Sequence, residues 1–422
     1  MIGTTLARRT PSWLRLAVAV AAVVLPAVAS PAVHFEQKGF VEAELSGFPQ
    51  LTPNDRAHVV GDLLLRWEPS LKFHNGLTLF LGVDARTDSH HQVERDLDFS
   101  WWDRTSRRPL LSARRLSLLY RHKFLTLEFG KQFVRWGKTD VLNPTDRFAP
   151  KDYLRVVDSD PLPVTAGRVT LEKGSNSLDL VYVPRFTPAR IPLLDQRWVE
   201  LPAGVPDLKL RDAGVRFPGG PQFGIRWNRI AAKLETSLSF YQGYNDLPLL
   251  TAALSPAPQS IGVRRNYPNL RAFGGDAAIP LRWFTLKTEA EALTSSTPGA
   301  DNYVLFVLQA ERQWKEWLFV GGYVGDAVTQ HGGGLQFAAD RGFSHAFLGR
   351  ASVNLAGSRS LVFEAVARQN GNGLYAKAEY SQAFGQHWRW SAMFKGIRGD
   401  PRDFLGQYRR NSFASIVARY SF

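Results

Sequence analysis

The chain of 422 residues contains no cysteine and only 2 methionines. Without cysteine it can form neither a disulfide framework nor a thiolate metal site. An exported protein benefits from this absence, because a chain without thiols cannot form wrong disulfides in an oxidising compartment.

Long apolar runs are also scarce. After residue 30 no stretch reaches the roughly 18 consecutive apolar residues of a membrane-spanning helix, so any further crossing of a membrane requires a closed sheet. The mean hydropathy is slightly negative, at -0.20. A barrel whose strands alternate lipid-facing and lumen-facing residues would average to such a value.

The N-terminus is the one place where apolar residues run together. Arg8, Arg9 and Arg15 precede an apolar segment at 16–29 that ends Ala-Val-Ala. This order is typical of a secretory signal peptide, so we predict removal of residues 1–29 and a mature domain at 30–422. The alternative, a membrane anchor, would need about 20 apolar residues. The formal charge of the whole chain is +14. Removal of residues 1–29 takes away these three arginines and no acidic residue, so the predicted mature chain remains basic.

Segments of alternating character, separated by turn residues, recur along the rest of the chain, and they are the unit of a transmembrane β-barrel. We predict an all-β antiparallel barrel of about 18 strands, with a range of about 16–18. A segment at 208–217 is left open as a further strand. The predicted strands are 39–46, 58–67, 77–87, 112–121, 123–131, 163–173, 176–185, 221–229, 232–244, 266–279, 282–294, 301–313, 316–327, 343–356, 359–370, 373–385, 387–398 and 406–422.

The connections between these segments support the same fold. Single-chain bacterial barrels have short periplasmic turns and long outer loops. The predicted connections sort in this way, with both chain ends in the periplasm. Most of the short ones have one or two residues, and the long ones are 88–111, 132–162, 186–220, 245–265 and 328–342.

Charged residues alternate with apolar ones in the predicted strands. A charge on the lipid-facing side costs about 2–4 kcal/mol at the midplane, so the charged face belongs in the lumen. Basic and acidic residues nearly cancel there, and the sequence shows no ring or ladder of a single sign, which strong ion selectivity would need. The predicted lumen-lining residues are Arg115, Arg168, Arg226, Lys287, Glu289, Glu364, Arg368, Lys377, Arg389 and Arg419.

The loop predicted at 132–162 is long and carries charges of both signs together with aromatic residues. Long loops without regular structure are uncommon unless they are functional. We interpret this loop as folded into the barrel, where it forms either a pore constriction or a structural plug. The constriction candidates are Arg135, Lys138, Asp140, Asp146, Arg147, Lys151, Asp152 and Arg155.

The final strand ends with Tyr420 and, two residues later, Phe422. This ending resembles the terminal strand of bacterial outer-membrane β-barrels. The resemblance implies that Tyr420 and Phe422 form the signal that the barrel assembly machinery recognises, and that the protein is located in the bacterial outer membrane.

A second resemblance lies at Gly130-Lys131-Gln132, Trp136-Gly137 and Asn143-Pro144-x-Asp146. These motifs resemble a segment of porin-like and alginate-export-type outer-membrane channels of Gram-negative bacteria. The resemblance implies a large barrel that moves small solutes or an anionic polysaccharide. The near balance of lumen charges departs from the strongly basic lumen that an alginate conduit should have.

Three functional hypotheses follow. The first is a passive channel for small polar or charged solutes. The second is a conduit for an anionic polysaccharide or a lipid that works with a periplasmic or inner-membrane machine. The third, a barrel enzyme, is disfavoured because no GxSxG motif occurs and the histidines are scattered.

The sequence predicts no cofactor, no metal site and no nucleic-acid partner. His90 and His91 are adjacent, which is not the i, i+4 spacing of a helical zinc site. The expected partners are small or anionic solutes, outer-membrane lipid, and lipopolysaccharide. The phosphates of lipopolysaccharide could contact basic loop residues such as Arg104, Arg107 and Arg108.

Overall fold

The computed structural model describes residues 33–140, 142–199, 209–255, 260–369 and 372–422. The predicted signal peptide at 1–29 lies outside these residues. Within the described part of the chain, no helix is both long enough and apolar enough to cross a membrane.

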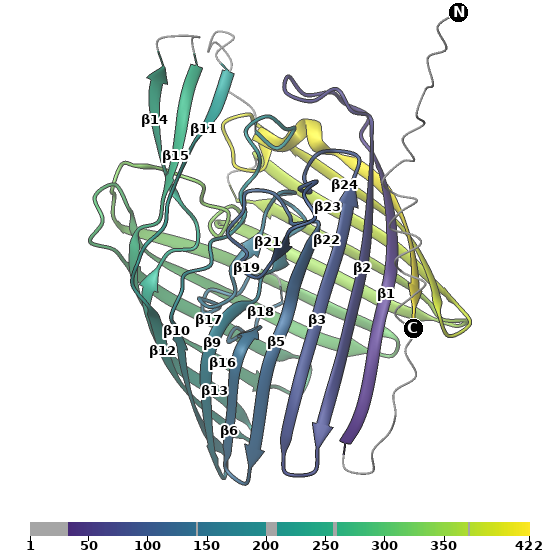
Figure 1. Ribbon diagram of the computed structural model, residues 1–422, viewed down its shortest axis with the longest axis vertical. Helices are drawn as coiled ribbons and strands as arrows, with labels where there is room; N and C mark the ends of the chain where they lie inside the picture. Colours follow the sequence, from purple (N-terminus) through teal and green to yellow (C-terminus); the bar gives the residue numbers. More distant parts are fainter. Residues whose placement is uncertain (1–32, 141, 200–208, 256–259, 370–371) are drawn as a thin grey trace, which may run out of the picture.

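The described chain is built almost entirely of β-strands (Figure 1). Eighteen of them form a closed antiparallel barrel, which confirms the predicted fold class and strand number. The barrel strands are β1 (Val33–Gly47), β2 (Val59–Phe73), β3 (Leu77–Asp88), β5 (Leu111–His122), β6 (Leu125–Gln132), β9 (Val164–Lys173), β10 (Asn176–Val183), β12 (Gln222–Ala231), β13 (Leu234–Tyr244), β16 (Asn269–Pro280), β17 (Thr285–Thr294), β18 (Asn302–Trp314), β19 (Trp317–Gln330), β21 (Ala346–Leu355), β22 (Arg359–Arg368), β23 (Gly373–Phe384), β24 (Trp388–Gly399) and β25 (Phe413–Ser421).

Each barrel strand pairs with the next one along the chain, and the last strand closes the ring by pairing with the first. In that closing pair the register runs from Phe40 opposite Ser421 to Gly47 opposite Ala414. Tight turns gather at one end of the barrel and long loops at the other (Figure 1). Closure leaves no free sheet edge, which is the condition for a sheet to span a membrane.

Two sequence predictions change in the structure. Residues 406–411 do not extend the last strand: they form a 3₁₀-helix, η1 (Gly406–Asn411), because Tyr408 packs against Trp198 and the Asn411 amide donates to the Arg197 carbonyl. The segment at 208–217 does form a strand, β11 (Lys209–Arg216), but not in the barrel. It belongs to a separate four-stranded sheet.

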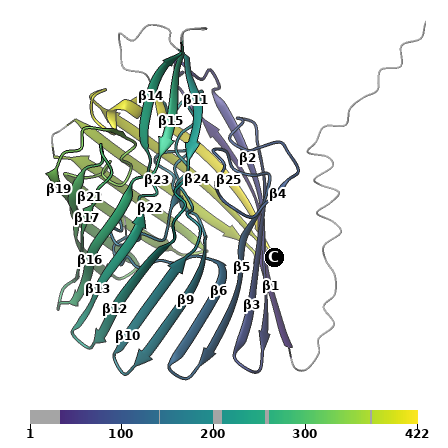
Figure 2. The same ribbon diagram turned by 60° about the vertical axis from the view of Figure 1, so that its left-hand side comes forward.

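That separate sheet rises above the barrel at its long-loop end (Figure 2). Its other strands are β14 (Leu249–Ser255), β15 (Ser260–Asn266) and β20 (Leu335–Gln336). Three further two-residue strands lie in loops: β4 (Phe99–Ser100), β7 (Lys151–Asp152) and β8 (Asp160–Pro161).

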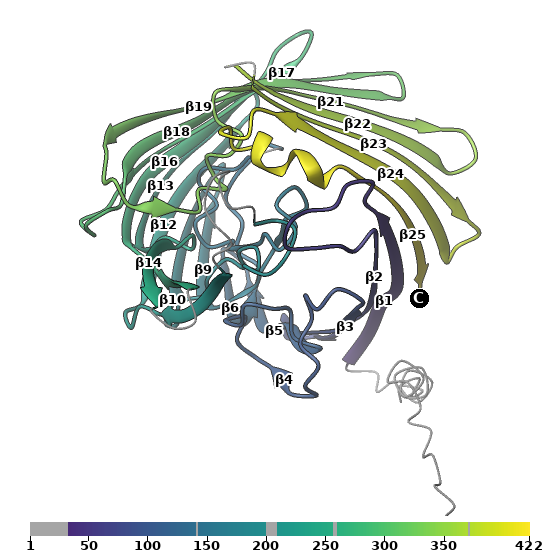
Figure 3. The ribbon, with the colours of Figure 1, turned by 90° about the horizontal axis from the view of Figure 1, so that it is seen from above.

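The buried apolar core lies inside the ring and not between two layers. Residues 133–140 and 142–163, which we call the inward loop, leave the barrel wall after β6 and run through the lumen before β9 (Figure 3). Trp136 and Phe148 of this loop make an edge-to-face pair at 5.1 Å, and Phe148 makes another with Tyr241 of the wall at 5.1 Å. The loop is therefore packed against the wall on its apolar side.

The barrel wall tolerates little extra volume where the inward loop departs. Gly130 has φ 115°, and a Cβ there would meet the Leu116 carbonyl oxygen at 2.2 Å. We expect Gly130→Ala to lower the free energy of unfolding by about 1–3 kcal/mol, since a residue with a side chain is strained in this conformation. Urea unfolding in lipid vesicles, followed by gel mobility, measures the change.

The control is Gly47→Ala in β1, where the nearest atom to an added Cβ is the Ala414 carbonyl oxygen at 3.9 Å. Equal stability of the two variants would contradict this account of Gly130.

Candidate functional site in the barrel lumen

Glu289 of β17 fixes the first half of the inward loop to the barrel wall. Its carboxylate is 0% exposed. It accepts hydrogen bonds from the backbone amides of Lys138, Thr139 and Thr145 at 3.0, 3.2 and 2.8 Å. The hydroxyls of Thr139 and Thr145 donate to it as well, at 2.9 and 2.8 Å. The buried Glu289 carboxylate therefore finds its hydrogen-bond donors in the inward loop. The same bonds give the buried loop amides and hydroxyls an acceptor.

A tight turn inside the loop depends on Asp146. Its Oδ1 accepts from the backbone amides of Trp136 and Gly137 at 2.5 and 2.7 Å, which closes residues 136–146 into a compact unit. Gly137 fits there because an added Cβ would lie 2.4 Å from the Asn143 side chain. The Trp136 indole N–H donates to Asp179 of β10 at 2.9 Å, so this unit is also bound to the wall.

Ion pairs hold the same half of the loop to the neighbouring strands. The Arg147 guanidinium lies 2.9 Å from the Glu291 carboxylate, and both side chains are buried. The Lys138 ammonium lies 3.1 Å from Glu235 and 3.3 Å from Asp276. These bonds join the loop to β13, β16 and β17.

The second half of the loop begins at Asp152, a fully buried carboxylate. Arg108 approaches it with two nitrogens at 2.9 and 3.0 Å, and Arg190 with one at 3.3 Å. Burial alone would raise the pKa of Asp152, but the two guanidinium charges outweigh burial and hold that pKa well below its usual value. Asp152 therefore stays ionised and ties the inward loop to two other outer loops.

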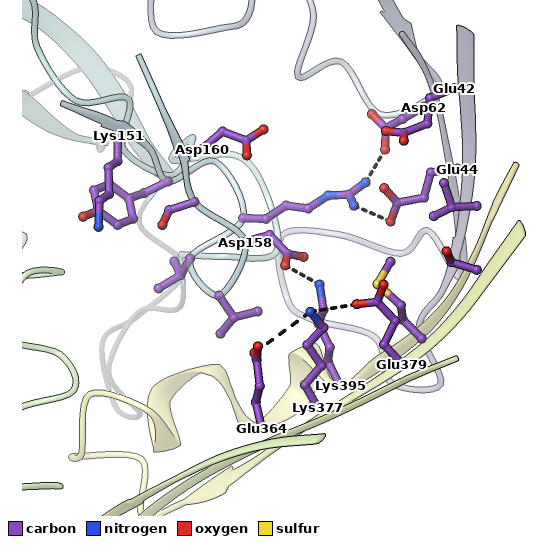
Figure 4. Close-up of a pocket in the computed structure, with 18 of the residues that line it drawn as sticks. Glu42, Glu44, Asp62, Lys151, Asp158, Asp160, Glu364, Lys377, Glu379 and Lys395 are labelled. Atoms are coloured by element: carbon purple, nitrogen blue, oxygen red, sulfur yellow. Dashed lines mark hydrogen bonds and ion pairs between the residues drawn. The ribbon is translucent and has the colours of Figure 1, made fainter. Parts of the chain in front are cut away.

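Arg155 reaches from the loop to the opposite wall. Its guanidinium pairs with Glu44 of β1 at 2.9 Å and with Asp62 of β2. Burial acts to lower the pKa of Arg155, whereas these two carboxylates raise it, and the net shift is upward. Asp158 pairs with Lys395 of β24 on the same side of the lumen (Figure 4). Because Glu289 of β17 holds the first half of the loop, the loop spans the lumen between β17 and this side.

Beside this bridge the lumen holds a cavity of about 920 Å³, which we call the lumen cavity. It lies between the second half of the inward loop and the inner faces of β1, β2 and β21 to β25. Charged side chains of both signs line it (Figure 4). The basic ones are Arg86, Arg108, Lys151, Arg155, Arg350, Lys377, Arg389, Lys395 and Arg419, and the acidic ones are Glu42, Glu44, Asp62, Asp140, Asp158, Asp160, Glu364 and Glu379.

Most of these charges are paired. Arg419 donates to Glu42 at 2.7 Å, and Lys377 lies 2.9 Å from Glu379. Among the described residues, Lys151 and Arg389 are cavity-lining cations with no carboxylate oxygen within 4.0 Å. Burial lowers the pKa of Lys151. Arg389 is exposed and Lys151 only partly so, which makes Arg389 the more accessible of these two cations.

The predicted constriction candidates divide into two groups. Asp140, Lys151 and Arg155 line the lumen cavity. The others serve contacts within the loop or with the wall. Asp146, Arg147 and Asp152 are buried in the bonds described above, Lys138 pairs with the wall, and Arg135 is exposed at 3.6 Å from Asp146.

The predicted lumen-lining residues all face inward, but only some border the cavity. Glu364, Lys377, Arg389 and Arg419 do so. Glu289 lies beneath the inward loop. The rest pair with neighbouring carboxylates: Arg115 with Glu128, Arg168 with Asp179, Arg226 with Asp276, Lys287 with Glu311 and Asp140, and Arg368 with Asp403.

Sequence reasoning missed the site role of Asp158 and Asp160, which the inward loop places in the cavity, and the pairing of Asp158 with Lys395. The alternation of β24 does put Lys395 on the inner face. No local pattern could pair it with Asp158, because 237 residues separate the two.

At the chain end, Tyr420 packs edge-on against Trp388 at 5.1 Å and stacks on His387 at 5.4 Å. Phe422 forms a two-way backbone hydrogen-bond pair with Gly39, at 2.9 and 3.0 Å. Among the described residues, no group of three or more potential ligands could hold a metal ion.

The geometry defines a closed transmembrane barrel with a partly filled polar lumen, and solved porins share this fold. The chain is similar to a BenF-like porin from Pseudomonas fluorescens Pf-5, with a TM-score of 0.55 and 10% identity over 92% of this chain and 98% of that one. It is similar to Acinetobacter baumannii OccAB4, with a TM-score of 0.55 and 10% identity over 93% and 98%. Pseudomonas aeruginosa OpdQ gives a TM-score of 0.53 and 9% identity over 92% and 98%.

No family model matches the chain, and no curated protein matches it by sequence. The alginate-export resemblance therefore gains no support, whereas the porin-like part of it agrees with the solved structures in fold.

Removing the Glu289 carboxylate tests its hold on the inward loop. We expect Glu289→Ala to leave the amides of Lys138, Thr139 and Thr145 without an acceptor. Each buried amide without a partner destabilises the folded loop by about 1–3 kcal/mol. The freed loop should make single-channel current noisier and raise its mean in planar bilayers.

Glu128→Ala is the control, because Glu128 is also a buried wall carboxylate but its side-chain partners are Arg115 and Ser117 of the neighbouring strand β5. A quiet, unchanged current from the Glu289 variant would argue against anchoring by this residue.

Proposed function

We propose that the protein is a porin-like channel of the bacterial outer membrane, through which small polar or charged solutes diffuse passively. One observation carries this proposal: a closed barrel retains a polar cavity of about 920 Å³ beside a loop that is bonded to the wall on both sides. In this arrangement the tight turns face the periplasm and the long loops face outward. The signal peptide and the assembly signal at Tyr420 and Phe422 would deliver the chain there.

The inward loop sets the size limit of the proposed passage. It fills the side of the lumen near β10, β12, β13 and β16 to β18 with buried apolar residues. The cavity is left on the other side, near β1, β2 and β21 to β25. Arg155 and Asp158 cross the lumen at this level, so a solute must pass beside their ion pairs. This favours small solutes over a polymer.

The balance of charge predicts weak ion selectivity. Strong selectivity needs a ring or ladder of one sign. In the lumen cavity most opposing charges pair, as in Arg419 with Glu42. Among the described lining residues this leaves two cations, Arg389 and Lys151, and one carboxylate, Asp160, without an opposite charge within 4.0 Å. A slight preference for anions follows.

The second sequence hypothesis, a polysaccharide or lipid conduit with a periplasmic machine, finds no comparable support. A polymer conduit needs a continuous wide passage, whereas the inward loop is bonded to opposite walls by Glu289 and Arg155. The proposed partners of the channel are small solutes, and the basic outer loops remain candidates for contact with lipopolysaccharide phosphates.

Arg389 offers a direct test of selectivity. We expect Arg389→Glu to move the reversal potential in a salt gradient from slight anion preference to cation preference, because it replaces an unpaired positive charge by a negative one in the cavity. Planar-bilayer recordings of the refolded mature chain measure this shift.

Arg359→Glu makes the same charge change on a residue at the tight-turn end that does not line the cavity. The channel proposal is wrong if the wild-type chain, shown to be folded, gives no single-channel steps. The selectivity account is wrong if both variants shift the reversal potential equally.

A further inference from the structure

The outer, lipid-facing wall of the barrel contains a groove across β18 to β24, which we call the outer groove. Its volume is about 760 Å³, and most of its lining is apolar. Its floor is a row of small residues that stand directly opposite one another on successive strands: Ala310, Gly321, Gly349, Ala365 and Ala376.

Bulky side chains border this row. On its tight-turn side, the next outward-facing positions carry Phe319, Phe363 and Phe394, and Phe284 of the preceding turn also lines the groove. At Gly321 and Gly349 an added Cβ would meet no atom within 4 Å, so the floor is open there. With strands about 4.8 Å apart, a row across five strands is about 19 Å long, more than half of a hydrocarbon core of about 30 Å.

A cation cluster lies at the tight-turn end of the groove. Arg312, which lines the groove, places its guanidinium 5.7 Å from the ring centre of Trp283, and Arg282 lies 5.2 Å from the same ring. Trp283 is 61% exposed. On the adjacent turn the Lys315 ammonium lies 5.3 Å from the ring of Trp314.

These cations have no carboxylate partner. Among the described residues, neither Arg282 nor Arg312 has a carboxylate oxygen within 4.0 Å. Exposed tryptophans at a strand end mark the membrane–water interface. Arginines at that height favour phosphate groups, which they can bind through two parallel hydrogen bonds.

We propose that the outer groove and this cluster together bind one anionic phospholipid of the periplasmic leaflet. Its phosphate lies between Arg282 and Arg312 beside Trp283, and one acyl chain lies along the row of small residues. The charge of the cluster favours a headgroup with net negative charge over a zwitterionic one. A second copy of the chain fits less well, because it would bury two unpaired guanidinium groups. The proposal does not depend on what the barrel transports, but its choice of the periplasmic leaflet rests on the proposed orientation with the tight turns in the periplasm.

Native mass spectrometry of the full mature chain in neutral detergent tests it, with phosphatidylglycerol and phosphatidylethanolamine as probes. We expect one phosphatidylglycerol to be retained in preference. The double variant Arg282→Gln with Arg312→Gln should reduce that retention about 30-fold, because two interfacial cations at about 1 kcal/mol each contribute about 2 kcal/mol. Filling the floor by Gly349→Phe should reduce the retention of both lipids.

Matched controls separate the site from the general surface. Lys173→Gln with Lys233→Gln removes two exposed cations at other tight turns, and Ala327→Phe introduces the same side chain at an outward position on β19 that does not line the groove. Both should leave retention unchanged. Gel mobility shows whether each variant is folded, and Gly321→Leu replaces Gly349→Phe if that variant does not fold.

Equal retention of the two lipids by the wild-type chain would overturn the proposal, as would an equal loss in the cation variant and its control. Dimers that disappear when the floor is filled would also overturn it, since they would show that a second copy covers the groove.

Discussion

The structure depends on one constraint, which is that every backbone amide and carbonyl at membrane depth must have a hydrogen-bond partner within the protein. In an antiparallel sheet every strand except the first and last forms backbone hydrogen bonds with a neighbour on both sides. Here the first and last strands form these bonds with each other. β25 pairs with β1 along its length, and the reciprocal bonds between Gly39 and Phe422 complete the seam at 2.9 and 3.0 Å. Closure in turn creates a lumen, whose polar side chains need partners of their own.

The inward loop supplies those partners. Glu289 and Glu291 on the wall would be uncompensated buried carboxylates without the loop amides and the Arg147 guanidinium that meet them. The loop likewise gains the wall that buries Trp136 and Phe148. Because each side satisfies the other, the loop belongs to the folded structure and does not hang freely in the lumen. The lumen cavity is the space that this packing leaves.

The fold could be predicted from the sequence because strand alternation and connection length are local properties. The alternation of residues in β17 and β24 places Glu289 and Lys395 on the inner face of the barrel, and this does not depend on which residues lie opposite them. The termination of the last strand could not be predicted, since residues 406–411 fold as η1 in response to Trp198 and Arg197, two distant residues.

The site was less predictable for the same reason. Composition placed many charges in the inward loop, but it could not say which would border open space. Asp146 and Asp152 accept hydrogen bonds within and beside the loop, whereas Asp158 faces the cavity. The difference arises from partners such as Lys395, which lies 237 residues further along the chain. Charge pairing across a lumen is a property of the closed ring and has no local signal.

The absence of cysteine makes one measurement especially direct. Arg389→Cys places a single thiol in the lumen cavity, and a bulky charged reagent that forms a disulfide with this thiol can be added while the current through one inserted barrel is recorded. If solutes pass through this cavity, modification lowers the current in one discrete step and a reducing agent restores it. An unchanged current, with modification confirmed by mass, would show that the conducting path, if any, does not run past Arg389 and would contradict the account.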